Sequence, residues 1–251
     1  MAIASSHPRL FVAGPLASGG DVALDRAQAH YLGRVMRLEA GDKVLLFNGR
    51  DGEWLAAVEA LGNGRCAVAV ERLTRAQAAE RGPWLAFAPV KKTGTDFIVE
   101  KATELGAARL LPVFTRRTNS ARLNRDRLRQ RAVEAAEQSG RLTLPEIAEP
   151  VTLDNLIGSW PAERALLVLD ETGGGRPIAR VLTDMRGARP TAAPPCCFLS
   201  GPEGGFEATE LDALRKLDFV IPVGLGPRVL RAETAALAAL SCWQALLGAD
   251  E

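Results

Sequence analysis

The sequence predicts an α/β protein in two parts, a small β-rich domain followed by a larger domain built on a parallel sheet. Two observations predict this fold class. Up to residue 73, short runs rich in Val, Leu, Phe and Ala alternate with Gly- and Asn-containing turns. From Trp84 onward, apolar runs alternate with helical segments, and this βαβ rhythm is typical of a parallel sheet covered on both faces.

The first domain is expected to span residues 1–74. Its predicted strands are residues 9–14, 43–47, 53–61 and 65–73. Turn sequences at residues 48–52 and 62–64 favour a small antiparallel sheet or barrel. Asp25 is a suitable N-cap for a short helix that runs to Val35. The polar segment 75–83, which ends in Gly82-Pro83, is predicted to link this domain to a second one at residues 84–251.

In the second domain, strands are predicted at residues 85–88, 109–114 and 164–169, with a further apolar run at 196–200. Gly106 should end a helix over residues 94–105, while Asn124 and Gly140 should begin and end another. The last helix, residues 231–247, places Leu237, Leu240, Trp243 and Leu247 close to one face. Core packing accounts for such a stripe, and a two-fold interface is also compatible with it.

Three glycine-rich turns lie at residues 170–175, 201–205 and 224–226, and each of them follows an apolar run. Glycine allows positive φ and close approach of the backbone to a ligand. Because the carboxyl ends of parallel strands meet at one crevice, these turns predict a shared ligand pocket, although each one alone also fits an ordinary strand-to-helix turn. Neither the dinucleotide fingerprint nor the P-loop sequence is present.

Composition excludes several classes of protein. Hydrophobic residues make up 47% and charged residues 24% of 251 residues, as in ordinary globular domains. No apolar run approaches the ~20 residues of a membrane helix, so we expect a cytoplasmic protein. The four cysteines form no Cys-x-x-Cys pair. The neighbours Cys196 and Cys197 are therefore expected to be buried thiols, and no metal is predicted.

The net charge of +1 does not indicate a nucleic-acid partner, but the charge is unevenly distributed along the chain. Residues 115–141 hold eight arginines against three acidic residues, a local excess of five positive charges. Such a run fits a solvated helix face and an RNA contact equally well.

Five sequence motifs carry a family resemblance: Gly-Pro-Glu-Gly-Gly-Phe (201–206), Leu-Gly-Pro-Arg-Val-Leu-Arg-Ala-Glu-Thr-Ala (225–235), Lys-Ala-Thr-Glu-Leu-Gly (101–106), Glu-Ala-Ala-Glu-Gln-Ser-Gly-Arg (134–141) and His-Tyr-Leu-Gly-Arg-Val-Met-Arg (30–37). With them, the chain resembles the 16S ribosomal RNA uridine-N3 methyltransferase family of the SPOUT superfamily along nearly its whole length. Glu207 departs from the family, which usually has a small hydroxyl residue there. Since Glu caps less well, we expect a weaker first turn in the helix that follows.

The resemblance implies a SPOUT methyltransferase domain with a C-terminal trefoil knot, preceded by a PUA-like RNA-binding barrel, in a homodimer. It also implies methyl transfer from S-adenosylmethionine to N3 of a uridine in 16S ribosomal RNA, free or in the assembled small subunit. Two turns and their neighbours are then expected to bind the cofactor: Leu169, Leu199, Ser200, Gly201, Pro202, Glu203, Gly204, Gly205, Val223, Gly224, Leu225, Gly226, Val229, Leu230 and Ala232.

The chemistry needs a group that removes the N3 proton or stabilises the uridine anion. Both histidines lie in the first domain. The available carboxylates are Asp170, Glu171, Glu203 and Glu233, and the available cations are Arg228 and Arg231. Of these, Arg231 is the first catalytic candidate and Glu203 the second, while an ion pair from Arg231 to Glu233 or Glu203 is the structural alternative. Candidate RNA contacts are Arg9, His30, Arg34, Arg37, Lys91, Lys92, Arg116, Arg122, Arg125, Arg129, Gln138 and Arg141.

Two other functions remain open from the sequence. A SPOUT methyltransferase that acts on another RNA, such as a transfer RNA, would share the cofactor loops. A non-catalytic RNA-binding or ribosome-assembly protein would keep the arginines but would not bind the cofactor.

Overall fold

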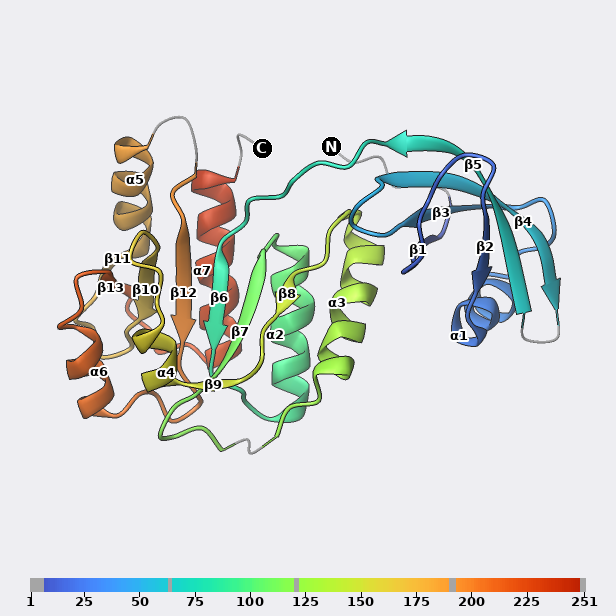
Figure 1. Ribbon diagram of the computed structural model, residues 1–251. Helices are drawn as coiled ribbons and strands as arrows, with labels where there is room; N and C mark the ends of the chain where they lie inside the picture. Colours follow the sequence, from blue (N-terminus) through green and yellow to red (C-terminus); the bar gives the residue numbers. More distant parts are fainter. Residues whose placement is uncertain (1–6, 63–64, 120–121, 190–192, 249–251) are drawn as a thin grey trace. The chain divides into compact units, whose positions relative to one another are not determined.

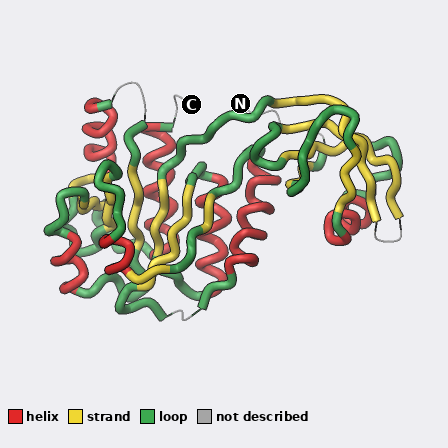
Figure 2. Tube along the Cα trace, in the orientation of Figure 1, coloured by secondary structure: helices red, strands yellow, loops and turns green. Residues whose placement is uncertain are grey.

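The computed structural model describes residues 7–62, 65–119, 122–189 and 193–248. The chain forms two compact units (Figures 1 and 2). The first comprises Met1–Ala79 with Ala136–Leu144, and the second comprises Glu80–Ala135 with Pro145–Glu251. This division differs from the expected one because residues 136–144 belong to the first unit. Local composition could not indicate this assignment, because it depends on contacts between residues far apart in the chain.

A five-stranded mixed sheet forms the first unit. Its strands are β1 (Arg9–Phe11), β2 (Asp21–Leu24), β3 (Lys43–Phe47), β4 (Glu53–Gly62) and β5 (Arg65–Arg75), in the order β1-β3-β4-β5-β2. The pairs β3–β4, β4–β5 and β5–β2 are antiparallel as predicted, but β1 is parallel to β3. A whole strand and a helix separate β1 from β3, so no tight hairpin forces them to be antiparallel. The predicted turn at residues 62–64 lies largely outside the described residues.

Alternate residues along these strands are buried, and their side chains form the core of the first unit. Ala56 and Val58 on β4, and Val68 and Val70 on β5, are at most 2% exposed. Alternate residues of a strand point to opposite faces, so one face of the sheet packs inward.

A short helical segment begins at Asp25, as the sequence predicted. The Asp25 carboxylate accepts from the Gln28 backbone N–H at 2.8 Å, and the Gln28 side chain accepts from the Asp25 N–H at 3.1 Å. This capping box starts α1 (Arg26–His30), which continues as a π-helix, η1 (Tyr31–Val35). Arg37 lies beyond it with φ of 56°, in the left-handed region. His30, Arg34 and Arg37 therefore do not share one regular helical face.

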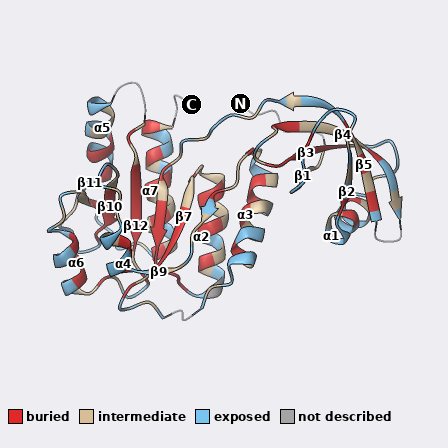
Figure 3. Cartoon of the chain, in the orientation of Figure 1, coloured by how far each residue is buried: buried red, intermediate tan, exposed pale blue. Residues whose placement is uncertain are grey.

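The second unit contains an all-parallel sheet, which confirms the predicted α/β class. Its strands are β6 (Trp84–Phe87), β7 (Arg109–Phe114), β8 (Glu146–Ile147), β9 (Val151–Thr152), β10 (Ala165–Leu169), β11 (Arg176–Pro177), β12 (Cys196–Ser200) and β13 (Val220–Gly224). The order is β11-β13-β10-β12-β6-β7-β8, with β9 also paired to β7. Figure 3 shows β6, β7 and β12 almost entirely buried.

Helices cover both faces of this sheet. They are α2 (Lys92–Glu104), α3 (Arg125–Ser139), α4 (Leu153–Gly158), α5 (Ile178–Ala188), α6 (Ala208–Leu214) and α7 (Ala232–Leu247). On β12, Cys196 and Phe198 pack with α2, α5 and α7, whereas Cys197 and Leu199 pack with α4 and α6. The central strand is thus buried on both sides, as its continuous apolar sequence requires.

The helix boundaries follow the predicted capping residues. Asn124 accepts from the Arg127 backbone N–H at 3.0 Å at the start of α3. Gly106 and Gly140 follow α2 and α3 with φ of 79° and 81°, the left-handed conformation typical after a helix. At the start of α6 the Glu210 carboxylate accepts from the Glu207 N–H at 2.9 Å, and the weaker first turn expected from Glu207 stays a prediction.

The apolar stripe of α7 serves the core. Leu240, Trp243 and Leu247 are each at most 4% exposed and pack in the same cluster as β6 and β12, and Leu237 is half-buried. The stripe therefore gives no support to a two-fold interface, and both the homodimer and the trefoil knot stay predictions. The four cysteines are free thiols, and burial raises the pKa of Cys196 to about 12.

Candidate ligand site at the carboxyl ends of the parallel strands

A cavity of about 1200 Å³ opens in the second unit where β6, β10, β12 and β13 end. The segments after these four strands and the first turns of α2 and α7 form its walls. Of the predicted cofactor residues, thirteen line it: Leu169, Ser200, Gly201, Pro202, Glu203, Gly205, Val223, Gly224, Leu225, Gly226, Val229, Leu230 and Ala232. The fold therefore brings the three glycine-rich turns together, as the strand-end rule predicts.

Two predicted cofactor residues do not line this cavity. Leu199 is fully buried in the core cluster of the opposite sheet face. Gly204 also lies outside it, and a Cβ added there would make only ordinary contacts of 3.6 Å with Arg117. The sequence could not separate Gly204 from its neighbour Gly205, because only the backbone angles distinguish them.

Gly205 and Gly226 need their glycines for conformational reasons. Gly205 has φ of 67°, and a Cβ there would overlap the Glu171 carboxylate. Gly226 has φ of 108°, which side-chain-bearing residues rarely adopt. Together with half-buried Leu225 and Leu230, they give the cavity a bare-backbone and apolar wall, suited to a flat ligand with polar edges.

Asp170 holds the loop after β10. Its fully buried carboxylate accepts from the Thr172 hydroxyl at 2.6 Å and from the Arg215 guanidinium at 2.7 Å. Burial acts to raise the pKa of Asp170, but the hydrogen bonds from Thr172 and Arg215 outweigh it and the pKa lies below its ordinary value. Asp170 is therefore an ionised structural anchor of the cavity wall.

The catalytic candidates Arg231 and Glu203 both line the cavity. Glu203 accepts from the Lys91 backbone N–H at 3.1 Å, which ties the loop after β12 to the segment before α2. Arg231 is exposed at the N-cap of α7. Within the described parts of the chain, no ion pair joins Arg231 to Glu203 or Glu233, so the structural alternative for this arginine is not realised.

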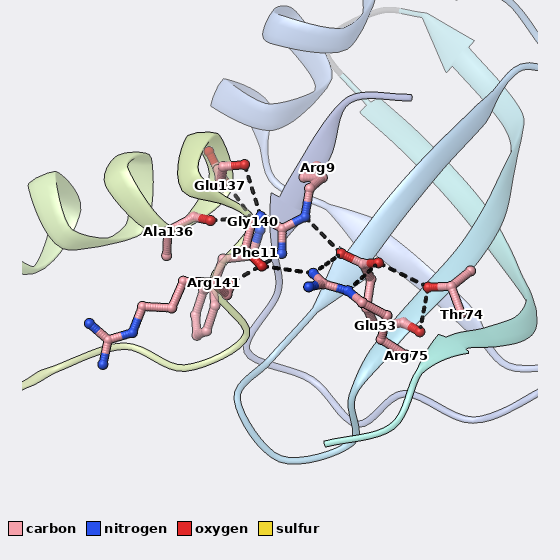
Figure 4. A network of polar contacts seen from close by, with 9 residues as sticks. All are labelled: Arg9, Phe11, Glu53, Thr74, Arg75, Ala136, Glu137, Gly140 and Arg141. Atoms are coloured by element: carbon pink, nitrogen blue, oxygen red, sulfur yellow. Dashed lines mark hydrogen bonds and ion pairs between the residues drawn. The ribbon is translucent and has the colours of Figure 1, made fainter. Parts of the chain in front are cut away.

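Two predicted RNA contacts are structural instead. In the first unit, the buried Arg9 guanidinium binds Glu53 at 2.7 Å and the backbone oxygens of Ala136, Glu137 and Arg141 at 2.6, 2.9 and 3.0 Å (Figure 4). Arg141 is 8% exposed and donates to the Thr143 hydroxyl at 3.1 Å. Burial removes both from the set of surface RNA contacts.

Other arginines of the basic segment are paired with acidic residues from elsewhere in the second unit. Arg125 binds Glu149 and the Ile147 carbonyl, and Arg127 binds Asp96. Arg116 lies 3.4 Å from Glu207. The charge excess counted along the sequence is therefore partly neutralised by partners that the fold supplies.

The remaining predicted RNA residues lie on the surface. His30, Arg34 and Arg37 are exposed in the first unit, as is Gln138 at the end of α3. Arg122 and Arg129 are exposed in the second unit, and exposed Lys91 lines the cavity. Lys92 begins α2, but its side chain lies outside the described part of the structure.

Sequence reasoning missed one wall of the cavity. Val90, Thr93, Gly94 and Phe97 line it beside Lys91. These residues follow β6, so the same strand-end rule could have identified them. The motif at residues 101–106 lies further along the chain and does not line the cavity.

Other kinds of site find no support in the described residues. Within residues 7–62, 65–119, 122–189 and 193–248, no three His, Cys, Asp or Glu side chains gather closely enough to hold a metal ion. Within the same ranges, no helix has the length and apolar character needed to cross a membrane.

The fold and the cavity define a class: an α/β protein with a ligand site at the carboxyl ends of its parallel strands, joined to a small β unit. More particularly, the chain belongs to the RNA methyltransferase family. The model of the RNA methyltransferase domain matches residues 81–244, and the model of the RNA methyltransferase PUA domain matches residues 24–71.

Relatives span nearly the whole chain. Ribosomal RNA small subunit methyltransferase E of Rickettsia conorii is 30% identical over 236 residues, which is 94% of each chain. The protein of the same name from Synechocystis is 34% identical over 244 residues, covering 95% of this chain and 78% of that one.

Solved structures agree with this assignment. Ribosomal RNA small subunit methyltransferase E from Neisseria gonorrhoeae, bound to S-adenosylmethionine, has a TM-score of 0.84 at 26% identity, covering 96% of this chain and 98% of that one. A methyltransferase from Legionella pneumophila with the same bound cofactor has a TM-score of 0.83 at 27% identity and the same coverage.

Proposed function

We propose that this protein transfers a methyl group from S-adenosylmethionine to N3 of a uridine in 16S ribosomal RNA of the small subunit. The observation that carries the proposal is the cavity of about 1200 Å³ where bare-backbone turns after β10, β12 and β13 converge. Relatives named for small-subunit ribosomal RNA and solved neighbours bound to S-adenosylmethionine support the same reading. A ribosomal RNA substrate is consistent with a cytoplasmic location.

The cofactor fits the lining of the cavity. The turns at Gly205 and Gly226 expose backbone groups, and Leu169, Val223 and Ala232 supply apolar surface. We therefore assign adenine and ribose binding to these turns. S-adenosylmethionine supplies an electrophilic methyl group, so the protein needs mainly to orient the acceptor and to manage the N3 proton.

Arg231 is assigned to the uridine anion. The loss of the N3 proton leaves negative charge on O2 and O4, which a guanidinium can stabilise. Arg231 lines the cavity and has no acidic partner among the described residues, so its charge is available there. Glu203, which lines the same cavity, is assigned to fixing the Lys91 segment through one oxygen and to accepting the proton through the other.

We further propose a division of labour along the chain. Residues 1–74 act as a PUA-like RNA-binding domain that residues 136–144 complete, the rest of residues 84–251 carries catalysis, and residues 75–83 connect them. A homodimer is part of the proposal from family resemblance, and sedimentation that gives a monomer at micromolar concentration would remove it.

Two measurements test the function. Calorimetry should show binding of S-adenosylmethionine to the purified protein, which a non-catalytic RNA-binding protein would lack. Nucleoside analysis by mass spectrometry, after incubation with small subunits or 16S RNA from a strain that lacks the gene, should show 3-methyluridine. A different methylated nucleoside, or methylation of transfer RNA alone, would contradict the proposed substrate.

A further inference from the structure

The cavity in the second unit has two unusual apolar residues at its edge. Among the described residues of this unit, Phe97 and Val229 are the large apolar side chains that stand exposed, at 42% and 80%. Both line the cavity, although they come from different segments, α2 and the loop before α7. Exposed large apolar side chains that gather at one cavity mark a binding surface.

The exposure of Phe97 is not explained by the packing of its own helix. Its neighbours Ile98, Val99 and Ala102 on α2 are fully buried in the core. Lys101 lies 5.9 Å from the Phe97 ring centroid, but its ammonium group is held by Glu100 and Glu104 at 2.8 Å each. The ring therefore keeps a large open surface at the cavity.

The cavity has room for a second group beside the cofactor, and its apolar lining residues differ in exposure. A cavity of about 1200 Å³ exceeds the ~300 to 1,000 Å³ of typical small-ligand pockets. The apolar residues assigned to the cofactor, Leu169, Val223 and Ala232, are at most 8% exposed. A base that belongs to a large RNA must enter from solvent, and it meets the exposed edge first.

The charges at the cavity match such a base. Lys91 and Arg231 are both exposed and line the cavity with Phe97 and Val229. Aromatic side chains stack on the faces of nucleobases, and nearby cations favour both the phosphate backbone and a base that loses a proton.

From these observations we infer that Phe97 and Val229 form the apolar walls of the acceptor subsite, where a pyrimidine of the RNA stacks beside Lys91 and Arg231. Val229, which the sequence placed among the cofactor residues, is thereby reassigned to the acceptor base. This inference rests on the proposed function and adds to it the residues that position the acceptor base. Phe97 is a substrate-contacting residue in this assignment, and the cofactor does not depend on it.

Photocrosslinking tests the contact without relying on turnover. Small-subunit RNA transcribed with 4-thiouridine is irradiated with the full-length protein in the presence of S-adenosylhomocysteine, and tryptic peptides are mapped. A crosslink in the peptide of residues 93–101, which contains Phe97, is expected. Crosslinks confined to peptides of the first unit would overturn the inference.

Matched variants provide the second test. Phe97→Ala should lower kcat/KM for RNA by about 10- to 100-fold, the usual effect of losing one stacking platform, with unchanged S-adenosylmethionine affinity. Phe97→Tyr should restore the rate. Thr183→Ala, which shortens an exposed side chain on α5 of the second unit that does not line the cavity, is the control and should have little effect. Thermal unfolding checks that each variant is folded.

The outcomes are distinguishable. If wild type binds the cofactor and methylates RNA but Phe97→Ala is equally active, the subsite is wrong and the function stands. If Phe97→Ala loses cofactor affinity in proportion to rate, Phe97 belongs to the cofactor wall. If wild type itself neither binds the cofactor nor methylates RNA, the proposed function fails.

Discussion

Arg9 and Glu53 form a buried ion pair, with 2.7 Å between guanidinium Nε and carboxylate Oε2 and side chains 8% and 5% exposed. Arg75 binds the same carboxylate at 2.6 Å. Nη1 of Arg9 donates to the carbonyls of Ala136 and Glu137, which the last turn of a helix leaves without intrahelical partners. One side chain thus satisfies a buried carboxylate and a helix terminus together.

Removing Arg9 should destabilise the first unit. Arg9→Ala leaves Glu53 buried with one cation and uncaps the end of α3, and loss of one partner of a buried pair typically costs about 3 kcal/mol. Denaturant unfolding measures the change in unfolding free energy. Lys43→Ala breaks an exposed pair with Glu71 at 2.5 Å and should cost below about 1 kcal/mol. Equal costs for the two variants would contradict the structural role of Arg9.

The same pair should make stability depend on pH. Burial acts to raise the pKa of Glu53, but the hydrogen bonds from Arg75 and Arg9 outweigh it and the pKa lies below its ordinary value of 4.5. A carboxylate with a lowered folded-state pKa stabilises the protein above its unfolded pKa, and this contribution disappears as pH falls through the folded value. Between pH 7 and pH 3, the melting temperature should therefore fall less steeply with decreasing pH in Glu53→Gln than in wild type.

Cofactor binding should respond differently at two adjacent glycines. Gly205→Val forces a strained φ and overlaps Glu171 at the cavity, so affinity for S-adenosylmethionine should drop by at least ~10-fold. Gly204→Ala places its Cβ at 3.6 Å from Arg117, off the cavity, and should bind normally. Calorimetry on both variants makes the comparison, and the opposite ranking would show that the wrong turn holds the cofactor.

Arg231→Ala should lose turnover far more than cofactor affinity. A group that stabilises the uridine anion acts mainly in the transition state, and removing one such donor typically costs ~10² to 10³ in rate. Raising the pH should partly rescue the variant, since more uridine is then already deprotonated. Single-turnover methylation across pH measures both effects. A full rate, or a defect explained by lost cofactor binding, would return Arg231 to a structural role.

RNA affinity should depend on salt through the exposed arginines. Each lost phosphate contact lowers the slope of log K against log salt by about 1. Arg122→Ala is expected to do so, while Arg125→Ala should have a smaller effect because Arg125 already binds Glu149 and Ile147. A triple alanine variant of Arg122, Arg125 and Arg129 tests the segment as a whole. An unchanged slope in the triple variant would identify the segment as a solvated helix face.

Local signals predicted most of the elements. The cap at Asp25, the stops at Gly106 and Gly140 and the apolar run at β12 all depend on residues close in sequence. The parallel pairing of β1 with β3 was missed, because pairing depends on residues far apart in the chain.

Gly205 and Gly226 could be predicted as site residues because each lies in a glycine-rich turn that follows a strand of the parallel sheet. The site was not predictable where a side chain's partner comes from afar. Arg9 was predicted as an RNA contact because it is a basic residue of the first domain. Its burial against Glu53 and Ala136 is visible only in the fold. Phe97 follows β6, so the strand-end rule could have placed it at the cavity, but the 42% exposure of its side chain is visible only in the fold.

The assignment of residues 136–144 to the first unit bears on the order of events during protein synthesis. The ribosome completes Met1–Ala79 long before it makes the last turn of α3. Until Leu144 has emerged, Phe11 and Phe47 lack the contacts that Ala136 and Leu142 provide, and Arg9 lacks its carbonyl acceptors. The amino-terminal unit therefore cannot mature as the first finished piece of the nascent chain, and its completion must wait for part of the domain that follows it.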